Sequence, residues 1–140
     1  MLKFIVKTHR KDIVHAGNQI YILSKGLNSG KPRKEPFTNS FVIILQSEED
    51  AETVYWLAYS LWKAKFWHQS LCGSVIPFLR LTEFKKSFNI KVYETTLNFQ
   101  QHQKRIKALK ILEQQAQHFQ KNLTLINELR STILHSLYNR

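Results

Sequence analysis

The sequence predicts an α+β protein with a small, mostly antiparallel sheet, an aromatic-rich helix that covers it, and a long C-terminal helix with heptad character. Three observations predict this class. Short β-rich runs fill the chain up to residue 46, a helical apolar period follows Ser47, and the last third contains neither Gly nor Pro. We therefore expect a core domain over residues 1–92 and a helical segment over residues 93–140, packed on the core or on a partner.

Three runs predict the strands of the sheet: residues 2–8 (LKFIVKT), 19–24 (QIYILS) and 40–46 (SFVIILQ). The third run is apolar on both faces, which is typical of a central strand, whereas Lys3 and Lys7 indicate that one face of the first strand contacts solvent. The sequence therefore predicts three strands with the third in the middle.

A basic loop connects the second and third predicted strands, with the sequence KGLNSGKPRK. It is not a Walker A motif, because too few residues separate Gly26 from Gly30 and Pro32 stands where a hydroxyl group is needed. A residue before proline also avoids helical angles, so no phosphate-binding helix begins here. We predict a solvated loop at the end of the sheet whose cations bind phosphate groups: Lys25, Lys31, Arg33 and Lys34.

The next segment carries clear helix signals. Ser47 is a good N-cap, and Glu48 and Glu49 place negative charge at the positive end of the helix dipole, which explains these acidic residues without a metal ion. Residues at helical spacing predict one buried face, made of Ala51, Val54, Tyr55, Ala58, Leu61 and Trp62.

A second stripe on this helix contains Trp56, Tyr59, Lys63 and Trp67. Its rings would suit the stacking of unpaired bases, or they would simply be buried; we favour burial and keep Lys63 and Trp67 as candidate binding residues. After this helix, residues 73–88 predict an apolar segment that ends at Leu81 and a short amphipathic turn with three further candidate cations, Arg80, Lys85 and Lys86.

One long helix is predicted from about Thr96 to Tyr138. Its first half carries a basic band of candidate binding residues: Lys104, Arg105, Lys107 and Lys110. Apolar residues repeat every seven positions and predict a helix-association seam, with Arg130 as a polar member: Leu109, Leu112, Ala116, Phe119, Leu123, Ile126, Ile133 and Leu137. The seam makes a homodimer through this helix possible.

Composition favours an acidic partner. The chain of 140 residues has 21 Lys and Arg against 10 Asp and Glu, a formal net charge of +11, which attracts nucleic acid, a ribonucleoprotein or anionic lipid. Cys72 is the only cysteine, which excludes an intramolecular disulfide and a four-cysteine zinc site and suits a reducing cytoplasm. No apolar run is long enough for a signal peptide or a membrane span, so we expect no membrane partner.

Catalytic patterns are weak. The histidines form no HExxH or HxxxH pair, so we expect no metal, no cofactor and no enzymatic activity. Two minor alternatives stay open. His68 and Cys72, four residues apart, would form a thiolate–base pair if a helix joined them, and His9 and His15 would serve as the acid and base of a metal-independent ribonuclease.

Three segments carry a resemblance: GLNSGKPRKEPFTNSFVI (26–43), YWLAYSLWKAKFW (55–67) and GSVIPFLRLTEFKK (73–86). Over roughly the first ninety residues the chain resembles small uncharacterised proteins of bacterial mobile genetic elements. It is also similar to an anti-CRISPR inhibitor of a type VI RNA-guided RNA nuclease. The resemblance implies the cytoplasm of a host bacterial cell as the setting, and it brings no catalytic residue.

Together these features predict a non-enzymatic basic inhibitor of a host RNA-guided nuclease, which binds the effector ribonucleoprotein or its guide RNA. A DNA-binding accessory protein of a mobile element, dimeric through the seam, is the alternative. A ribonuclease is the third possibility.

Overall fold

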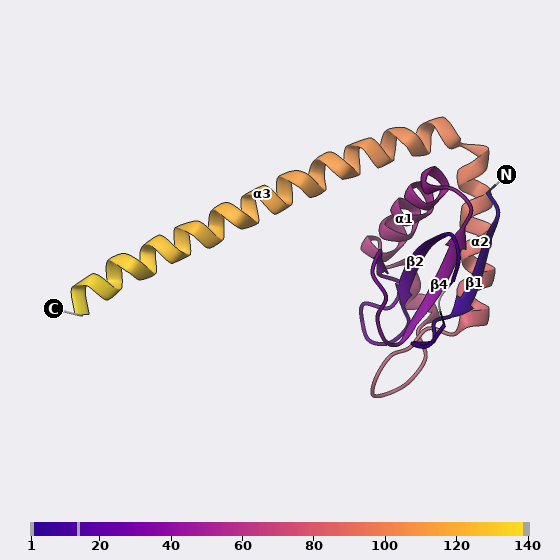
Figure 1. Cartoon of the computed structure of the whole chain (residues 1–140), viewed down its shortest axis with the longest axis horizontal. Helices are drawn as coiled ribbons and strands as arrows, with labels where there is room; N and C mark the ends of the chain where they lie inside the picture. Colours follow the sequence, from indigo (N-terminus) through magenta and orange to yellow (C-terminus); the bar gives the residue numbers. More distant parts are fainter. Residues whose placement is uncertain (1, 14, 139–140) are drawn as a thin grey trace. The chain divides into compact units, whose positions relative to one another are not determined.

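The computed structural model describes residues 2–13 and 15–138. The chain forms two compact units, Met1–Phe99 and Gln100–Arg140. The first unit contains an antiparallel sheet and two α-helices, and the second belongs to one long helix (Figure 1). The predicted α+β class is confirmed.

Among the described residues the sheet has four strands: β1 (Phe4–Thr8), β2 (Asn18–Leu23), β3 (Pro32–Arg33) and β4 (Ser40–Leu45). Their order is β1-β4-β2-β3, and every neighbouring pair is antiparallel. The central position predicted for the third run is confirmed, because β4 lies between β1 and β2 and is buried on both faces. Lys7 on β1 is exposed, as its strand pattern predicts.

The basic loop is more ordered than the sequence indicates. Its Pro32–Arg33 segment forms the edge strand β3, and the Gly30 N–H donates to the Leu23 carbonyl at 2.7 Å. Gly30 has a φ of +97°, and a Cβ there would lie 2.1 Å from Cδ1 of Trp67. Because the loop backbone packs directly on this indole ring, the prediction of a wholly solvated loop is wrong.

Helix α1 (Glu48–Lys63) begins as the sequence predicts. The Asp50 N–H donates to Ser47 Oγ at 3.1 Å, which confirms the N-cap. The helix ends where Lys65 adopts a left-handed φ of +58°, and a short 3-10 helix η1 (Phe66–Ser70) follows. This break places Trp67 in a different element from the aromatic residues of α1.

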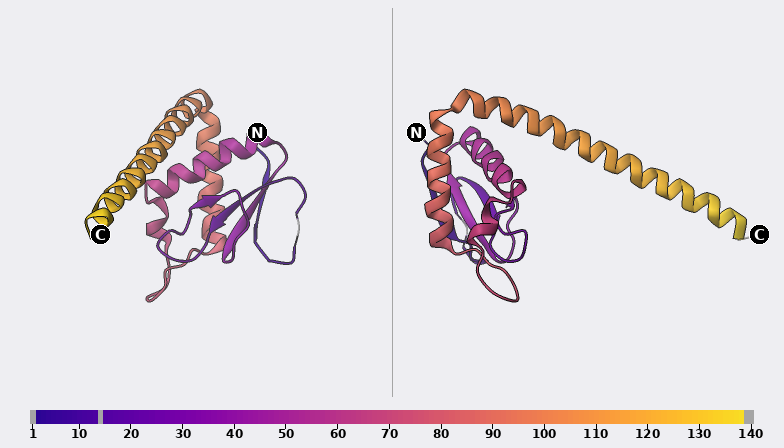
Figure 2. Two further views of the ribbon diagram at one scale, coloured as in Figure 1. Left: turned by 60° about the vertical axis from the view of Figure 1, so that its left-hand side comes forward. Right: turned by 180° about the vertical axis from the view of Figure 1, so that it is seen from behind.

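Helix α2 (Leu81–Leu97) replaces the short turn predicted for this region. Its buried residues Phe84, Phe88 and Val92 are four positions apart, so they form one face that packs on the sheet. The Phe84 ring stacks on Phe88 at 5.0 Å and lies 4.9 Å from Trp67. Helices α1 and α2 lie on the same side of the sheet and share its hydrophobic core (Figure 2).

Helix α3 (Phe99–Tyr138) is 40 residues long, so the predicted long C-terminal helix is confirmed. It begins after a break at Asn98, the C-cap of α2. At 1.5 Å per residue α3 has a length of about 60 Å.

Candidate nucleic-acid interface

Two lysines of the basic loop reach aromatic rings of α1. The Lys31 Nζ lies 5.1 Å from the centroid of the Trp62 ring, and the Lys34 Nζ lies 5.2 Å from that of Tyr55. Lys63, at the end of α1, places its Nζ 5.0 Å from the Trp62 ring. We call these five residues the cation–aromatic surface: Lys31, Lys34, Tyr55, Trp62 and Lys63. The structure thus joins the basic loop and the aromatic helix, two features that are separate in the sequence.

Trp62 is the centre of this surface because it carries two ammonium groups. Lys31 and Lys63 each lie about 5 Å from its centroid, so the two charges are within about 10 Å of each other. In the part of the chain that the structure describes, no carboxylate is within ion-pair distance of either lysine. Both ammonium groups would attract a phosphate group placed beside this ring, which makes this spot suitable for a phosphate group.

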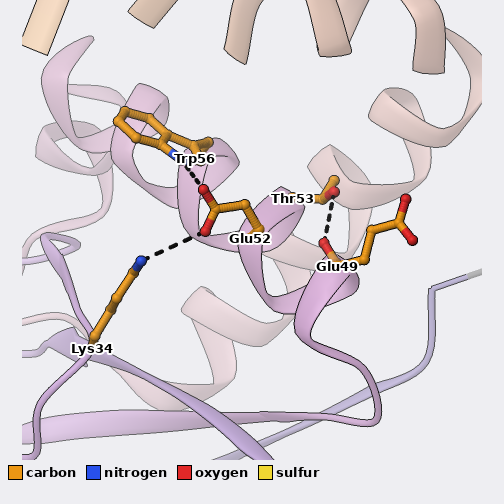
Figure 3. A network of polar contacts seen from close by, with 5 residues as sticks. All are labelled: Lys34, Glu49, Glu52, Thr53 and Trp56. Carbon is orange, nitrogen blue, oxygen red and sulfur yellow. Dashed lines mark hydrogen bonds and ion pairs between the residues drawn. The ribbon is translucent and has the colours of Figure 1, made fainter. Parts of the chain in front are cut away.

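Lys34 has a different environment, which Figure 3 shows in detail. Its Nζ lies 3.6 Å from Glu52 Oε2, and the Trp56 Nε1 donates a hydrogen bond to Glu52 Oε1 at 3.0 Å. The Lys34 side chain is 67% exposed, so this ion pair is weak. Lys34 therefore remains able to contact a second anion.

The aromatic residues of α1 form a row of edge-to-face contacts. Trp56 lies 5.5 Å from Tyr55 and 5.1 Å from Tyr59, and Tyr59 lies 5.8 Å from Trp62. Helical spacing predicts Tyr55 and Trp62 on the buried face, but both are only half-buried, and each lies beside a lysine. The rings support one another in this row, and each of the two outer rings attracts the lysines beside it.

Trp67 is not a binding residue. It is 1% exposed and belongs to the hydrophobic core, between Phe66, Phe84 and the loop at Gly30. The helical spacing of Trp67 from Trp56 and Tyr59 does not place it on the same helix face, because α1 ends at Lys63. The candidate role of Trp67 is therefore wrong, and burial, which we favoured for the second stripe, is confirmed at this residue.

The other two cations of the basic loop lie elsewhere. Arg33 is paired with Tyr21 on the opposite face of the sheet from α1, and its Cζ lies 5.1 Å from the Phe37 ring. Lys25 forms an isolated β-bridge with Phe78. The four loop cations therefore do not form one surface.

Exposed cations also occur at the start of α2, where Arg80 precedes the helix and Lys85 and Lys86 lie on it. Sequence reasoning missed Lys91, whose Nζ lies 5.3 Å from the Phe66 ring and 3.0 Å from Glu94 Oε2. The spacing of three residues between Lys91 and Glu94 on a helix is the sequence signal that predicts this ion pair.

The second unit, considered by itself, carries the basic band and the seam on one helix. Lys104, Arg105, Lys107 and Lys110 occupy the first part of α3. Apolar seam residues further along are about half exposed or more, such as Leu112 at 64%, Phe119 at 66% and Ile133 at 56%. The remaining seam members lie on the same helix: Leu109, Ala116, Leu123, Ile126 and Leu137. A lone helix cannot bury its own apolar stripe, so the seam stays a predicted association surface.

The predicted His68–Cys72 pair is not formed through a helix. His68 lies in η1, whereas Cys72 lies beyond it in an extended bridge with Phe78. In the described part of the chain no group of three or more His, Cys, Asp or Glu side chains is arranged to hold a metal ion. Within the same residues, no helix has the length and apolar character that a membrane span requires.

Comparison with known proteins gives a family and no function. No curated protein and no solved structure matches this chain. Residues 6–136 match a family of unknown function, DUF6943, and because the match spans most of the chain, the protein belongs to that family.

Proposed function

We propose that this protein is a non-enzymatic RNA-binding protein that contacts the phosphates of single-stranded RNA through the cation–aromatic surface. The observation that carries the proposal is the pair of ammonium groups, Lys31 and Lys63, over the single Trp62 ring, with no carboxylate partner in the described chain. The net charge of +11 supports attraction of a polyanion to this surface.

Phosphates are better ligands for this surface than bases. The ring of Trp62 already holds two lysines, and that of Tyr55 holds Lys34, so a stacked base would have to displace these cations. Ammonium groups held in place instead lose less side-chain entropy when a phosphate binds. Binding of this kind tolerates different sequences and weakens strongly with salt.

We propose RNA as the ligand, and a role for its binding, because the first ninety residues resemble proteins of mobile genetic elements and an anti-CRISPR inhibitor. We propose that the protein antagonises a type VI RNA-guided nuclease in the bacterial cytoplasm. Channels that hold RNA are positively charged, so a protein of net charge +11 would not replace RNA in them. It would instead compete for the guide RNA or bind the RNA-loaded effector.

One observation favours the alternative, a DNA-binding accessory protein of a mobile element. The exposed apolar residues of α3 suit a dimer, and dimers are typical of proteins that bind two DNA half-sites. This alternative predicts a preference for duplex DNA.

Binding measurements on the intact protein test the proposal. Fluorescence anisotropy at one fixed salt concentration should rank a labelled single-stranded RNA above duplex DNA of the same sequence, and the RNA should stay intact on a denaturing gel. Addition to a reconstituted type VI effector should reduce its RNA cleavage. Tighter binding to duplex DNA would support the accessory protein, and cleavage of naked RNA without metal would support the ribonuclease.

A further inference from the structure

The face of the sheet opposite α1 and α2 is partly covered by loops. Lys7, Val42, Tyr21 and Arg33 are aligned across the four strands and share this outer face. Val42 is 0% exposed and Tyr21 is 5% exposed, although the core shared with the helices lies on the other face. The residues after β1 and after β3 approach this face and leave a pocket between them.

The pocket has a volume of about 520 Å³. This is within the range of sites that hold small organic ligands. Aromatic and apolar side chains form much of its wall, together with polar groups and one lysine: His9, Lys11, Ile13, Gln19, Tyr21, Pro36, Phe37, Thr38 and Asn39. Such a mixture suits a flat ring that also forms a few hydrogen bonds.

One polar group in the wall is available to a ligand, and a second lies buried beside it. The Tyr21 hydroxyl donates to Gln19 Oε1 at 2.5 Å, and Gln19 Nε2 donates to the His15 carbonyl, so the tyrosine oxygen is fixed and can still accept a hydrogen bond. The His9 ring lies edge-to-face on Tyr21 at 4.9 Å. Its Nδ1 is buried and has no hydrogen-bond partner in the described chain.

Positive charge lies at the edge of this pocket. Lys11 is an exposed lining residue. The Arg33 guanidinium lies 5.1 Å from the ring of the lining residue Phe37. It also lies 3.7 Å from Glu35 Oε2, but both side chains are largely exposed, so this ion pair is weak and a phosphate can replace it. Guanidinium groups bind phosphate through two hydrogen bonds, so Arg33 is well suited to an anionic group attached to a buried ring.

We propose that this pocket binds one nucleotide. Its base packs against Phe37 and Tyr21 and donates a hydrogen bond to the Tyr21 hydroxyl oxygen, and its phosphate contacts Arg33 and Lys11. The nucleotide is either a free mononucleotide or an unpaired nucleotide of an RNA chain. The inference goes beyond the proposed function, because this site lies across the sheet from the cation–aromatic surface and is measured without RNA.

The first experiment is an NMR titration of the full chain with AMP, adenosine and ribose 5-phosphate. AMP should shift the resonances of His9, Tyr21 and Phe37, and adenosine should bind about tenfold more weakly because it lacks the phosphate contact. Ribose 5-phosphate lacks the base and should leave Tyr21 and Phe37 unshifted. Absence of shifts with AMP, or equal shifts with ribose 5-phosphate, would overturn the proposal.

Variants separate the base site from the phosphate site. Ile13→Trp fills the pocket from a position that is 46% exposed, and it should weaken AMP binding at least tenfold in a folded protein. Arg33→Gln should bring the affinity for AMP close to that for adenosine. The matched control, Lys121→Gln, removes one exposed charge from α3 and should leave AMP binding unchanged. Wild-type AMP affinity in a folded Ile13→Trp protein would refute the site.

Competition identifies the source of the nucleotide. If single-stranded RNA displaces AMP, the pocket holds a nucleotide of the RNA chain; if AMP stays bound in the presence of RNA, the pocket serves a free nucleotide. Failure of the pocket proposal can be distinguished from failure of the proposed function. Ile13→Trp changes the pocket but leaves the cation–aromatic surface intact, so RNA binding at that surface can be measured separately.

Discussion

Replacing Trp62 with leucine tests whether the ring organises the lysines. Trp62→Leu removes the ring that lies about 5 Å from both Lys31 and Lys63 but keeps both charges. Each lysine would then have to be ordered when RNA binds, at about 0.5–1.5 kcal/mol per side chain. Two lysines give about 1–3 kcal/mol, or roughly a 5- to 150-fold rise in Kd. The salt dependence should not change, because the number of phosphate contacts is the same.

The assay is fluorescence anisotropy with a labelled single-stranded RNA over a series of salt concentrations. Trp62→Phe is the matched control, because phenylalanine keeps a ring that attracts cations less strongly than indole does, and it should give an intermediate Kd. Trp62 is half-buried, so circular dichroism must first show that both variants are folded. A wild-type Kd in folded Trp62→Leu would refute the idea that the ring prepares the lysines for phosphate.

Three further predictions concern other parts of the chain. Gly30→Ala should lower the free energy of unfolding by about 3 kcal/mol in chemical denaturation, because alanine is strained at a φ of +97° and its Cβ meets Trp67; an unchanged midpoint would contradict this packing. If the seam of α3 mediates association, Leu112→Ser with Phe119→Ser should convert a dimer to a monomer in sedimentation, and a wild-type monomer at high micromolar concentration would exclude the dimer. Burial raises the pKa of Tyr21 above 10.0, so the unfolded chain loses this proton first and stability should fall as the pH rises above 10.0. Tyr21→Phe should make that fall shallower, and an identical pH profile would contradict the raised pKa.

Local signals predicted much of the fold. The alternation and apolar content of the strand runs, the cap at Ser47 and the absence of Gly and Pro along α3 each act within a few residues, so the sequence alone reveals them. The short turn predicted in place of α2 was wrong because the segment continues as a helix that buries Phe84, Phe88 and Val92. The four-residue spacing of Phe84 and Phe88 already indicated a helix.

The candidate site was less predictable because it depends on tertiary contacts. Lys31 meets Trp62 only because the basic loop packs on Trp67 and pairs with β2, and neither contact has a local sequence signal. The separation of Arg33 and Lys34 onto opposite faces of the sheet also depends on tertiary contacts. The edge strand β3 directs Arg33 to one face of the sheet, while Lys34 reaches α1 on the other.

The most direct test of the proposed function is the salt dependence of RNA binding after Lys31, Lys34 and Lys63 are changed together to glutamine. Loss of three phosphate contacts should reduce the log–log slope by about 2, so that the variant loses about 20-fold less affinity than wild type between about 50 and 200 mM salt. Lys3, Lys7 and Lys121, also changed to glutamine, form a control of equal charge that should keep nearly the wild-type slope. If the first variant is folded and has the wild-type slope, or if both variants change the slope equally, RNA does not bind at the cation–aromatic surface.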